Sequence, residues 1–138
     1  MTLKIQIVRD GEVIADFPLE RDVWAKETLE TELSEVESTI DPVSEMHDLF
    51  SNNVRTRMLS EMIRSSDRRF GELMDIVDAN QKIVSEHLRR MIEKGLATRV
   101  ETNPSEVHYV PTEKGFASML TCMVTRRILD ELDAMEVK

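Results

Sequence analysis

The sequence has few of the residues that would place the chain outside the cytoplasm. Its 138 residues include one cysteine, so an intrachain disulfide is impossible and a disulfide-stapled secreted scaffold is excluded. No apolar run reaches the roughly 18–20 residues that a membrane span needs. The first ten residues, MTLKIQIVRD, meet charged side chains too early for a secretory signal. We therefore expect a cytoplasmic protein with one ordinary domain and a small appendage.

Catalytic patterns are also missing. The chain has four glycines and no Gly-rich phosphate loop, no nucleophile elbow and no His-x-x-x-His pair. Pairs of acidic residues are frequent, but at this content of Asp and Glu they carry little information. We expect neither an enzyme nor a bound cofactor.

Basic residues are scarce relative to acidic ones. There are 18 against 27, giving a formal net charge of -9, and this argues at first against DNA, which is a polyanion. The deficit is local, however. Residues 1–50 hold 13 acids and 4 bases, whereas residues 51–138 hold 14 of each and residues 54–127 hold 13 bases and 10 acids. Net charge describes solubility and long-range steering and does not exclude a local DNA-binding face.

The acidic first third predicts an appendage over residues 1–40. Alternating apolar residues over 3–7 and 13–17, separated by Asp10-Gly11 and ended by Pro18, are typical of a β-hairpin. Residues 20–39 predict a helix with a thin apolar stripe, which Trp24 anchors against the core or a partner. Because an isolated hairpin is marginal in water, it must pack on its own domain or on a second subunit.

Residues 41–138 predict a mainly α domain with a small β element. Asp41-Pro42 indicates the start of a first helix that includes Leu49 and Phe50 on its apolar side. A second helix begins near Val54. A short helix over 70–77, a turn at 78–80 and a longer helix over 81–94 follow, then strands over 96–101 and 107–110 joined by a turn at 102–105, and a last helix from 111. This order is the winged helix-turn-helix plan.

Three motifs resemble a known family. Residues 84–96, VSEHLRRMIEKGL, are similar to the recognition-helix signature V-S-x-H-L-x-x-L-x-x-x-G-L of ArsR-type winged-helix transcriptional regulators, with Met91 in place of Leu. Residues 53–59, NVRTRML, resemble the segment that opens the second helix of that fold. Residues 108–115, HYVPTEKG, look like the end of the wing. The resemblance spans roughly residues 43–132 and is greatest to the archaeal branch of such domains.

The resemblance implies a regulator that binds double-stranded DNA as a homodimer. In this family the first and last helices form the contact between the two subunits. We expect the N-terminal segment to contribute to the dimer. The outward face of the 81–94 helix would enter the major groove, where Gln suits adenine and Arg suits guanine, and the bracing helix and the wing would reach phosphates. The candidate DNA-binding residues are Arg68, Arg69, Gln81, Lys82, Ser85, Glu86, Arg89, Arg90, Arg99 and Asn103.

Each candidate has a structural alternative. The outward face of the recognition helix could simply be solvated, and Glu86 suits DNA only where it accepts from a cytosine. Arg68 and Arg69 could pair with Glu72 or Asp67 instead of phosphate. Arg90 could be a surface charge, and Asn103 could belong only to the wing turn.

Metal sensing is not expected. ArsR-type metal sensors resemble one another in a Cys-x-Cys pair on the bracing helix or in Asp and His ligands on the last helix. Residues 70–74 contain no Cys and residues 112–138 no His. We interpret His87 as a packing or hydrogen-bonding residue and Cys122 as a small hydrophobic residue.

The leading hypothesis is thus a dimeric winged-helix regulator that binds a near-palindromic operator. The alternative is a winged helix that binds another protein, in which the acidic N-terminal segment docks the partner, since the fold alone does not decide function.

Overall fold

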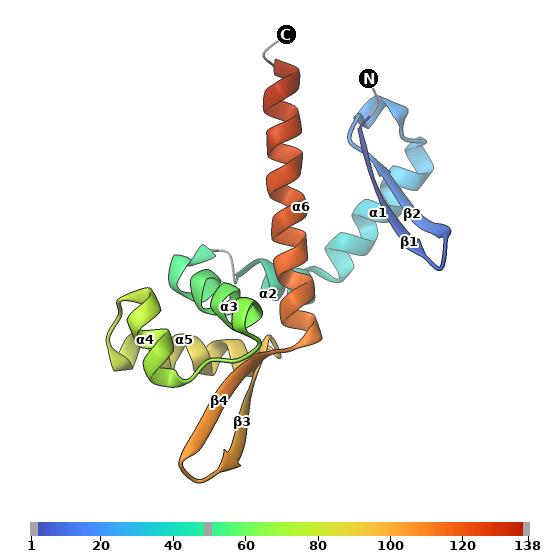
Figure 1. Cartoon of the computed structure of the whole chain (residues 1–138). Coiled ribbons are helices and arrows are strands. Elements are labelled where there is room, and N and C mark those ends of the chain that lie inside the picture. Colours follow the sequence, from blue (N-terminus) through green and yellow to red (C-terminus); the bar gives the residue numbers. More distant parts are fainter. Residues whose placement is uncertain (1–2, 49–50, 137–138) are drawn as a thin grey trace. The chain divides into compact units, whose positions relative to one another are not determined.

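The computed structural model describes residues 3–48 and 51–136. The chain divides into two compact units, Met1–Val43 and Ser44–Lys138 (Figure 1). None of the described helices combines the length and the apolar character needed to cross a membrane.

The first unit begins with the predicted β-hairpin. Strands β1 (Lys4–Arg9) and β2 (Glu12–Pro18) are antiparallel, with Ile5 opposite Phe17. The turn between them places Asp10 at φ 52° and Gly11 at φ 80°. Two successive residues with positive φ twist a two-residue turn in the sense that the flanking strands require, which is why Asp-Gly identified the hairpin.

The acidic helix is shorter than predicted. A 3₁₀ turn, η1 (Arg21–Val23), precedes helix α1 (Lys26–Ser38). Trp24 lies between them in extended backbone, so its assignment to the helix was wrong. Its indole Nε1–H donates to the carbonyl of Pro18 at 2.7 Å, and its ring lies 6.1 Å from that of Phe17. The indole therefore anchors the segment before α1 to the hairpin, because a partly buried Trp needs an acceptor as well as apolar contact.

Helix α2 (Ile40–Asp48) begins two residues earlier than predicted, since Asp41 was expected as the N-cap and Pro42 as the first helical residue. The hydroxyl of Thr39 donates to the carbonyl of Glu35 at 2.7 Å, which satisfies an end carbonyl of α1 and lets the next helix start at once. Asp41 then lies in the first turn instead of acting as the N-cap. Leu49 and Phe50 lie outside the described residues.

The second unit is a winged helix-turn-helix, as the sequence predicted. Helices α3 (Asn53–Ser65), α4 (Phe70–Val77) and α5 (Gln81–Glu93) precede strands β3 (Ala97–Asn103) and β4 (Glu106–Pro111), and helix α6 (Glu113–Glu136) ends the fold. The β3–β4 hairpin extends away from the helices (Figure 1). Strand β3 runs to Asn103, so the wing turn is tighter than the predicted 102–105.

One apolar core joins these elements. It includes side chains from three helices of the helix-turn-helix, from the start of the wing and from α6: Met58, Leu59 and Met62; Leu73 and Val77; Val84, Leu88 and Met91; Leu96 and Ala97; and Met119. These residues recur at three- and four-residue spacings along each helix. The stripe on α5 is the one that fixes which of its other side chains face outward.

Polar caps set the ends of the helices. The Asn52 side chain accepts from the amide of Val54 at 2.8 Å and starts α3, and the Asn80 side chain accepts from the amide of Ile83 at 3.0 Å and starts α5. Gly95, at φ 75°, follows the end of α5 in the left-handed conformation that glycine favours.

The start of α6 lies very close to the residue that leads into the wing. A Cβ placed on Gly115 would come within 2.1 Å of the backbone carbonyl oxygen of Leu96. We predict that Gly115→Ala lowers the free energy of unfolding by about 1–3 kcal/mol, because a backbone atom must move to admit the methyl group. Urea unfolding followed by circular dichroism measures the change.

The matched control is Gly71→Ala in α4, where an added Cβ meets nothing within 4 Å. Alanine is the better helix former, so this variant should be neutral or stabilising. Equal losses of stability in the two variants would contradict the close approach at Gly115.

Candidate nucleic-acid interface

Five of the predicted DNA-binding residues share the exposed side of α5. The opposite side carries the buried residues Val84, Leu88 and Met91. Because those three side chains enter the core, the helix cannot rotate about its axis, and the following residues all remain accessible to solvent: Gln81, Lys82, Ser85, Glu86 and Arg89. The structure thus presents an amide, two cations, a hydroxyl and a carboxylate on one helix face.

Arg89 lies between two carboxylates of its own helix. Its guanidinium nitrogens are each 2.6 Å from a carboxylate oxygen, one of Glu86 and one of Glu93. The hydrogen bond that Arg89 donates lowers the pKa of Glu86 below its usual value. All three side chains are more than half exposed, and exposed ion pairs of this kind contribute little to stability. Arg89 can therefore exchange these partners for a base edge.

Arg68 has a structural role. Its guanidinium lies 3.0 Å from Glu72, a pair that the sequence suggested, and 3.4 Å from Glu61, a pair that it did not suggest. Its backbone exchanges two hydrogen bonds with Tyr109 of the wing, at 2.9 and 2.7 Å. Arg68 therefore ties the segment before α4 to β4.

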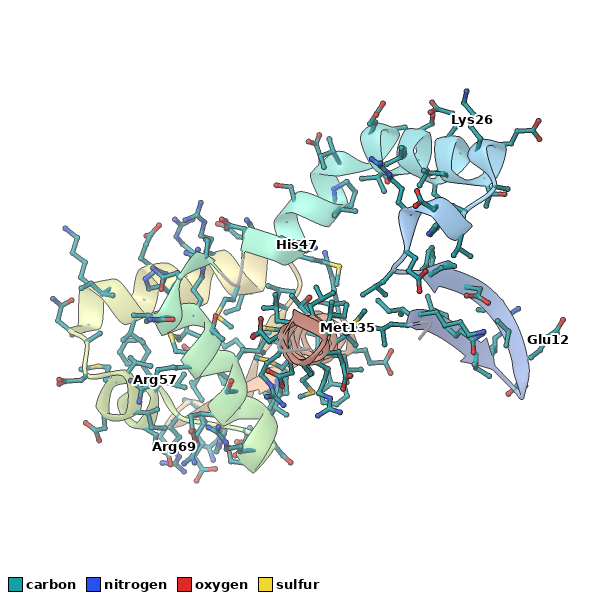
Figure 2. All side chains as sticks on the ribbon, turned by 90° about the horizontal axis from the view of Figure 1, so that it is seen from above. Glu12, Lys26, His47, Arg57, Arg69 and Met135 are labelled. Carbon is teal, nitrogen blue, oxygen red and sulfur yellow. The ribbon has the colours of Figure 1, made fainter. Side chains whose placement is uncertain are left out.

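Arg69 is exposed immediately before α4 and is labelled in Figure 2. Its backbone amide donates to the Glu72 carboxylate at 2.9 Å, and this hydrogen bond caps the helix. The bond involves only the backbone of Arg69, so it does not restrain the guanidinium. Of the two arginines before the bracing helix, Arg69 is thus the one better suited to a phosphate.

The remaining three candidates lie elsewhere. Arg90 is half exposed, and its Nε lies 3.8 Å from the carboxylate of Asp48 at the end of α2. Arg99 on β3 pairs with Glu101 at 3.0 Å and is also half exposed. The Asn103 side chain accepts from the amide and hydroxyl of Ser105 at 3.0 and 2.7 Å, so it forms the wing turn.

A hollow of about 270 Å³ joins α5 to the wing. Apolar side chains from α4, α5 and β4 and polar ones from α5 and β3 line it: Phe70, Leu88, Ile92 and Tyr109, with Ser85, Arg89, Glu93 and Arg99. The hollow thus brings Arg89 of the recognition helix and Arg99 of the wing to one surface, although they are ten residues apart in the sequence.

Sequence reasoning missed a buried arginine in α3. Arg55 in α3 is 5% exposed, and its guanidinium donates to the carbonyl of Asp48 at 3.0 Å and lies 3.2 Å from Nδ1 of His87. The carboxylate of Asp48 lies 2.9 Å from Nζ of Lys94. This polar cluster links the ends of α2 and α5 to α3. The available signal was the position of Arg55 three and four residues before the core residues Met58 and Leu59.

His87 has the hydrogen-bonding role that the sequence suggested. Burial lowers the pKa of its imidazole, and the neighbouring charge of Arg55 lowers it further. The neutral ring is the form that can accept a hydrogen bond from Arg55 at Nδ1. The fold therefore favours neutral His87.

The described residues include no cluster of three or more His, Cys, Asp or Glu side chains arranged to hold a metal ion. Cys122 is half-buried and packs against the apolar core.

Comparison with known proteins locates a family signature in this unit. Residues 52–99 match the model of the bacterial regulatory protein arsR family. The matched segment runs from the N-cap of α3 to the first residues of β3, so it contains the whole helix-turn-helix. The resemblance to ArsR-type regulators is thereby confirmed, and the match supports a DNA-binding regulator. The archaeal affinity stays a prediction.

Solved structures share the fold at low sequence identity. The transcriptional repressor BigR from Xylella fastidiosa is 20% identical, with a TM-score of 0.53 over 74% of this chain and 95% of that one. A MarR-family transcriptional regulator from Enterococcus faecalis V583 is 21% identical, with a TM-score of 0.60 over 83% and 94%. The antimony-specific repressor AntR is 17% identical, with a TM-score of 0.53 over 84% and 92%. No curated protein matches the chain significantly.

The lowered pKa of His87 predicts a pH-dependent stability. Because the folded state holds its proton less tightly than the unfolded state, the imidazole contributes stability above its ordinary pKa of about 6.5, and this is lost as the pH falls. We expect the free energy of unfolding to decrease between about pH 7 and 5. His87→Gln, which keeps an acceptor for Arg55, should remove much of that decrease in urea unfolding.

His47→Gln, at an exposed position of α2, is the control and should retain the wild-type pH dependence. A His87→Gln variant that follows the wild-type curve over this range would show that His87 does not cause the effect.

Proposed function

We propose that the protein is a transcriptional regulator that binds duplex DNA as a two-fold dimer. The observation that carries the proposal is the exposed face of α5 within the segment that matches the arsR family. A helix of this kind fits the major groove while the preceding helix braces it against the backbone. In this proposal α5 enters the groove and α4 is the bracing helix.

The side chains of α5 suit different contacts. Gln81 can pair with adenine and Arg89 with guanine, each through two hydrogen bonds. The hydroxyl of Ser85 can form a hydrogen bond with either base. Lys82 and, before α4, Arg69 fit phosphates, which set register and supply most of the affinity. Arg99 extends the cationic surface to the wing on the far side of the shared hollow.

Acidic groups weaken this surface and so set the strength of binding. Glu86 and Glu93 flank Arg89, and residues 54–127 have an excess of only three bases. Since counterion release scales with the number of phosphate contacts, we expect modest and salt-sensitive affinity. Glu86 would favour a cytosine opposite it and disfavour other bases.

The dimer would use the apolar surface of α6. Large apolar residues along this helix are substantially exposed: Phe116, Leu120, Met123, Val124, Leu129, Leu132 and Met135. Figure 2 views α6 along its axis, near the labelled Met135, with side chains projecting in every direction. A second copy would cover part of this surface. Two-fold symmetry would then place the α5 helices about one DNA turn apart, on a near-palindromic operator.

Loss of Arg89 should weaken DNA binding and relax one base preference. Arg89→Ala removes the guanidinium best placed for a bidentate contact to guanine. We therefore expect the affinity for the preferred duplex to fall about tenfold or more relative to wild type. Gel-shift titration of the preferred site and of single-base variants measures both effects.

Arg126→Ala is the matched control, because Arg126 also forms an i, i+4 ion pair on an exposed helix face but lies on α6. It should bind DNA as wild type does. The same loss of affinity in both variants, or an Arg89→Ala protein with unchanged preference at every base, would refute the assignment of Arg89 as a base-reading residue.

Charges placed on the apolar face of α6 should separate the dimer. Leu120 and Val124 lie one turn apart and are 43% and 42% exposed. Leu120→Glu/Val124→Glu would bury four carboxylates in a dimer, which is costly in free energy. Sedimentation should therefore show a monomer, and gel-shift titration should show that this monomer binds the operator poorly. Thr121→Glu/Thr125→Glu adds the same charge one residue along the helix and should remain dimeric. A wild-type protein that sediments as a monomer at all concentrations would contradict the dimer.

A further inference from the structure

Helix α1 is formed but buries none of its residues. It has 13 residues, and isolated helices of such length are marginally stable in water even with favourable sequences. Leu33 and Val36 are 48% and 46% exposed. A helix that keeps large apolar side chains in solvent lacks the packing that normally stabilises it, and this indicates that another surface covers it.

The apolar residues of α1 follow a coiled-coil spacing. Leu29, Leu33 and Val36 are separated by four and three residues, and Ile40 and Val43 of α2 continue the alternation. This is the repeat of heptad positions a and d, which form the seam between two helices. We call Leu29, Leu33 and Val36 the α1 seam.

The positions beside the α1 seam are acidic. With Leu33 at position a, Glu30 and Glu37 occupy e positions and Glu32 a g position. Side chains at e and g face those of the partner helix and select it by charge. A second copy of α1 would bring glutamates against glutamates in either orientation, so self-pairing is disfavoured.

Helix α6 of a second copy does not complement the negative charge beside the α1 seam either. Between residues 113 and 136, α6 carries three bases and five acids. A second copy of this chain therefore has neither in α1 nor in α6 the positive charge that would complement the glutamates. Nucleic acid and anionic lipid are disfavoured for the same reason.

We propose that the α1 seam docks a basic amphipathic helix of another protein, with apolar residues at a and d and Lys or Arg at e and g. The apolar stripe supplies the buried contact, and the three glutamates select the charge of the partner. In Figure 2 this helix begins at the labelled Lys26. The inference does not depend on DNA binding, because it concerns the first unit only.

Synthetic peptides of about four heptads test the proposal against the full chain. One peptide has Leu at a and d with Lys at e and g; a second replaces these Lys by Glu; a third keeps Lys but has Ser at a and d. Fluorescence anisotropy at physiological salt should show that the first binds about tenfold more tightly than either of the others. Equal binding of the Lys peptide with Ser at a and d would show simple charge attraction and would overturn the proposal.

Charge reversal on α1 identifies the surface. Glu30→Lys/Glu37→Lys should exchange the preference, so that the Glu peptide binds more tightly than the Lys peptide. Glu27→Lys/Glu35→Lys makes the same change of charge away from the seam and should keep the wild-type preference. Unchanged preference in the first variant, or exchanged preference in both, would refute docking at the α1 seam. DNA binding measured on the same proteins reports separately on the proposed regulator function.

Discussion

The winged unit depends on the burial of one face of α5. Val84, Leu88 and Met91 enter the same core as Met58 and Leu59 of α3, and this contact fixes the rotation of α5 about its axis. Every outward side chain of the helix is placed by that contact. Deleting buried methylene groups there would cost several kcal/mol in a typical core, about 2–5 for Leu→Ala, and would also release the orientation on which the proposed DNA recognition depends.

The polar cluster around Arg55 adds a second restraint. The guanidinium joins the end of α2 to His87 of α5, so α2 and α5 are linked through α3 by directional bonds. Burying a cation is costly unless it is paired and hydrogen-bonded. Such a cluster therefore defines one arrangement of the helices more sharply than apolar packing does, and the neutral state of His87 belongs to that arrangement.

The order of the elements could be predicted from the sequence, because local signals agreed with the packing. Asp10-Gly11 predicted the hairpin turn, and the turn at 78–80 predicted where the helix over 81–94 begins. The predictions failed where a contact between residues several positions apart in the sequence determines the position or the partner of a side chain. Trp24 lies before α1 because its indole finds the Pro18 carbonyl. In the sequence, Arg68 and Arg55 cannot be told apart from exposed cations. Only the fold shows that Glu61 is a further partner of Arg68 and that the Asp48 carbonyl accepts from Arg55.

The central claim is that α5 reads duplex DNA in a two-fold dimer. The most direct measurement is selection of bound sequences from a random duplex pool by the full chain, at low salt because the cationic surface is weak. We expect enrichment of a near-palindrome whose half-sites lie about one helical turn apart. Recovery of no enriched sequence, or of a single half-site without symmetry, would contradict it.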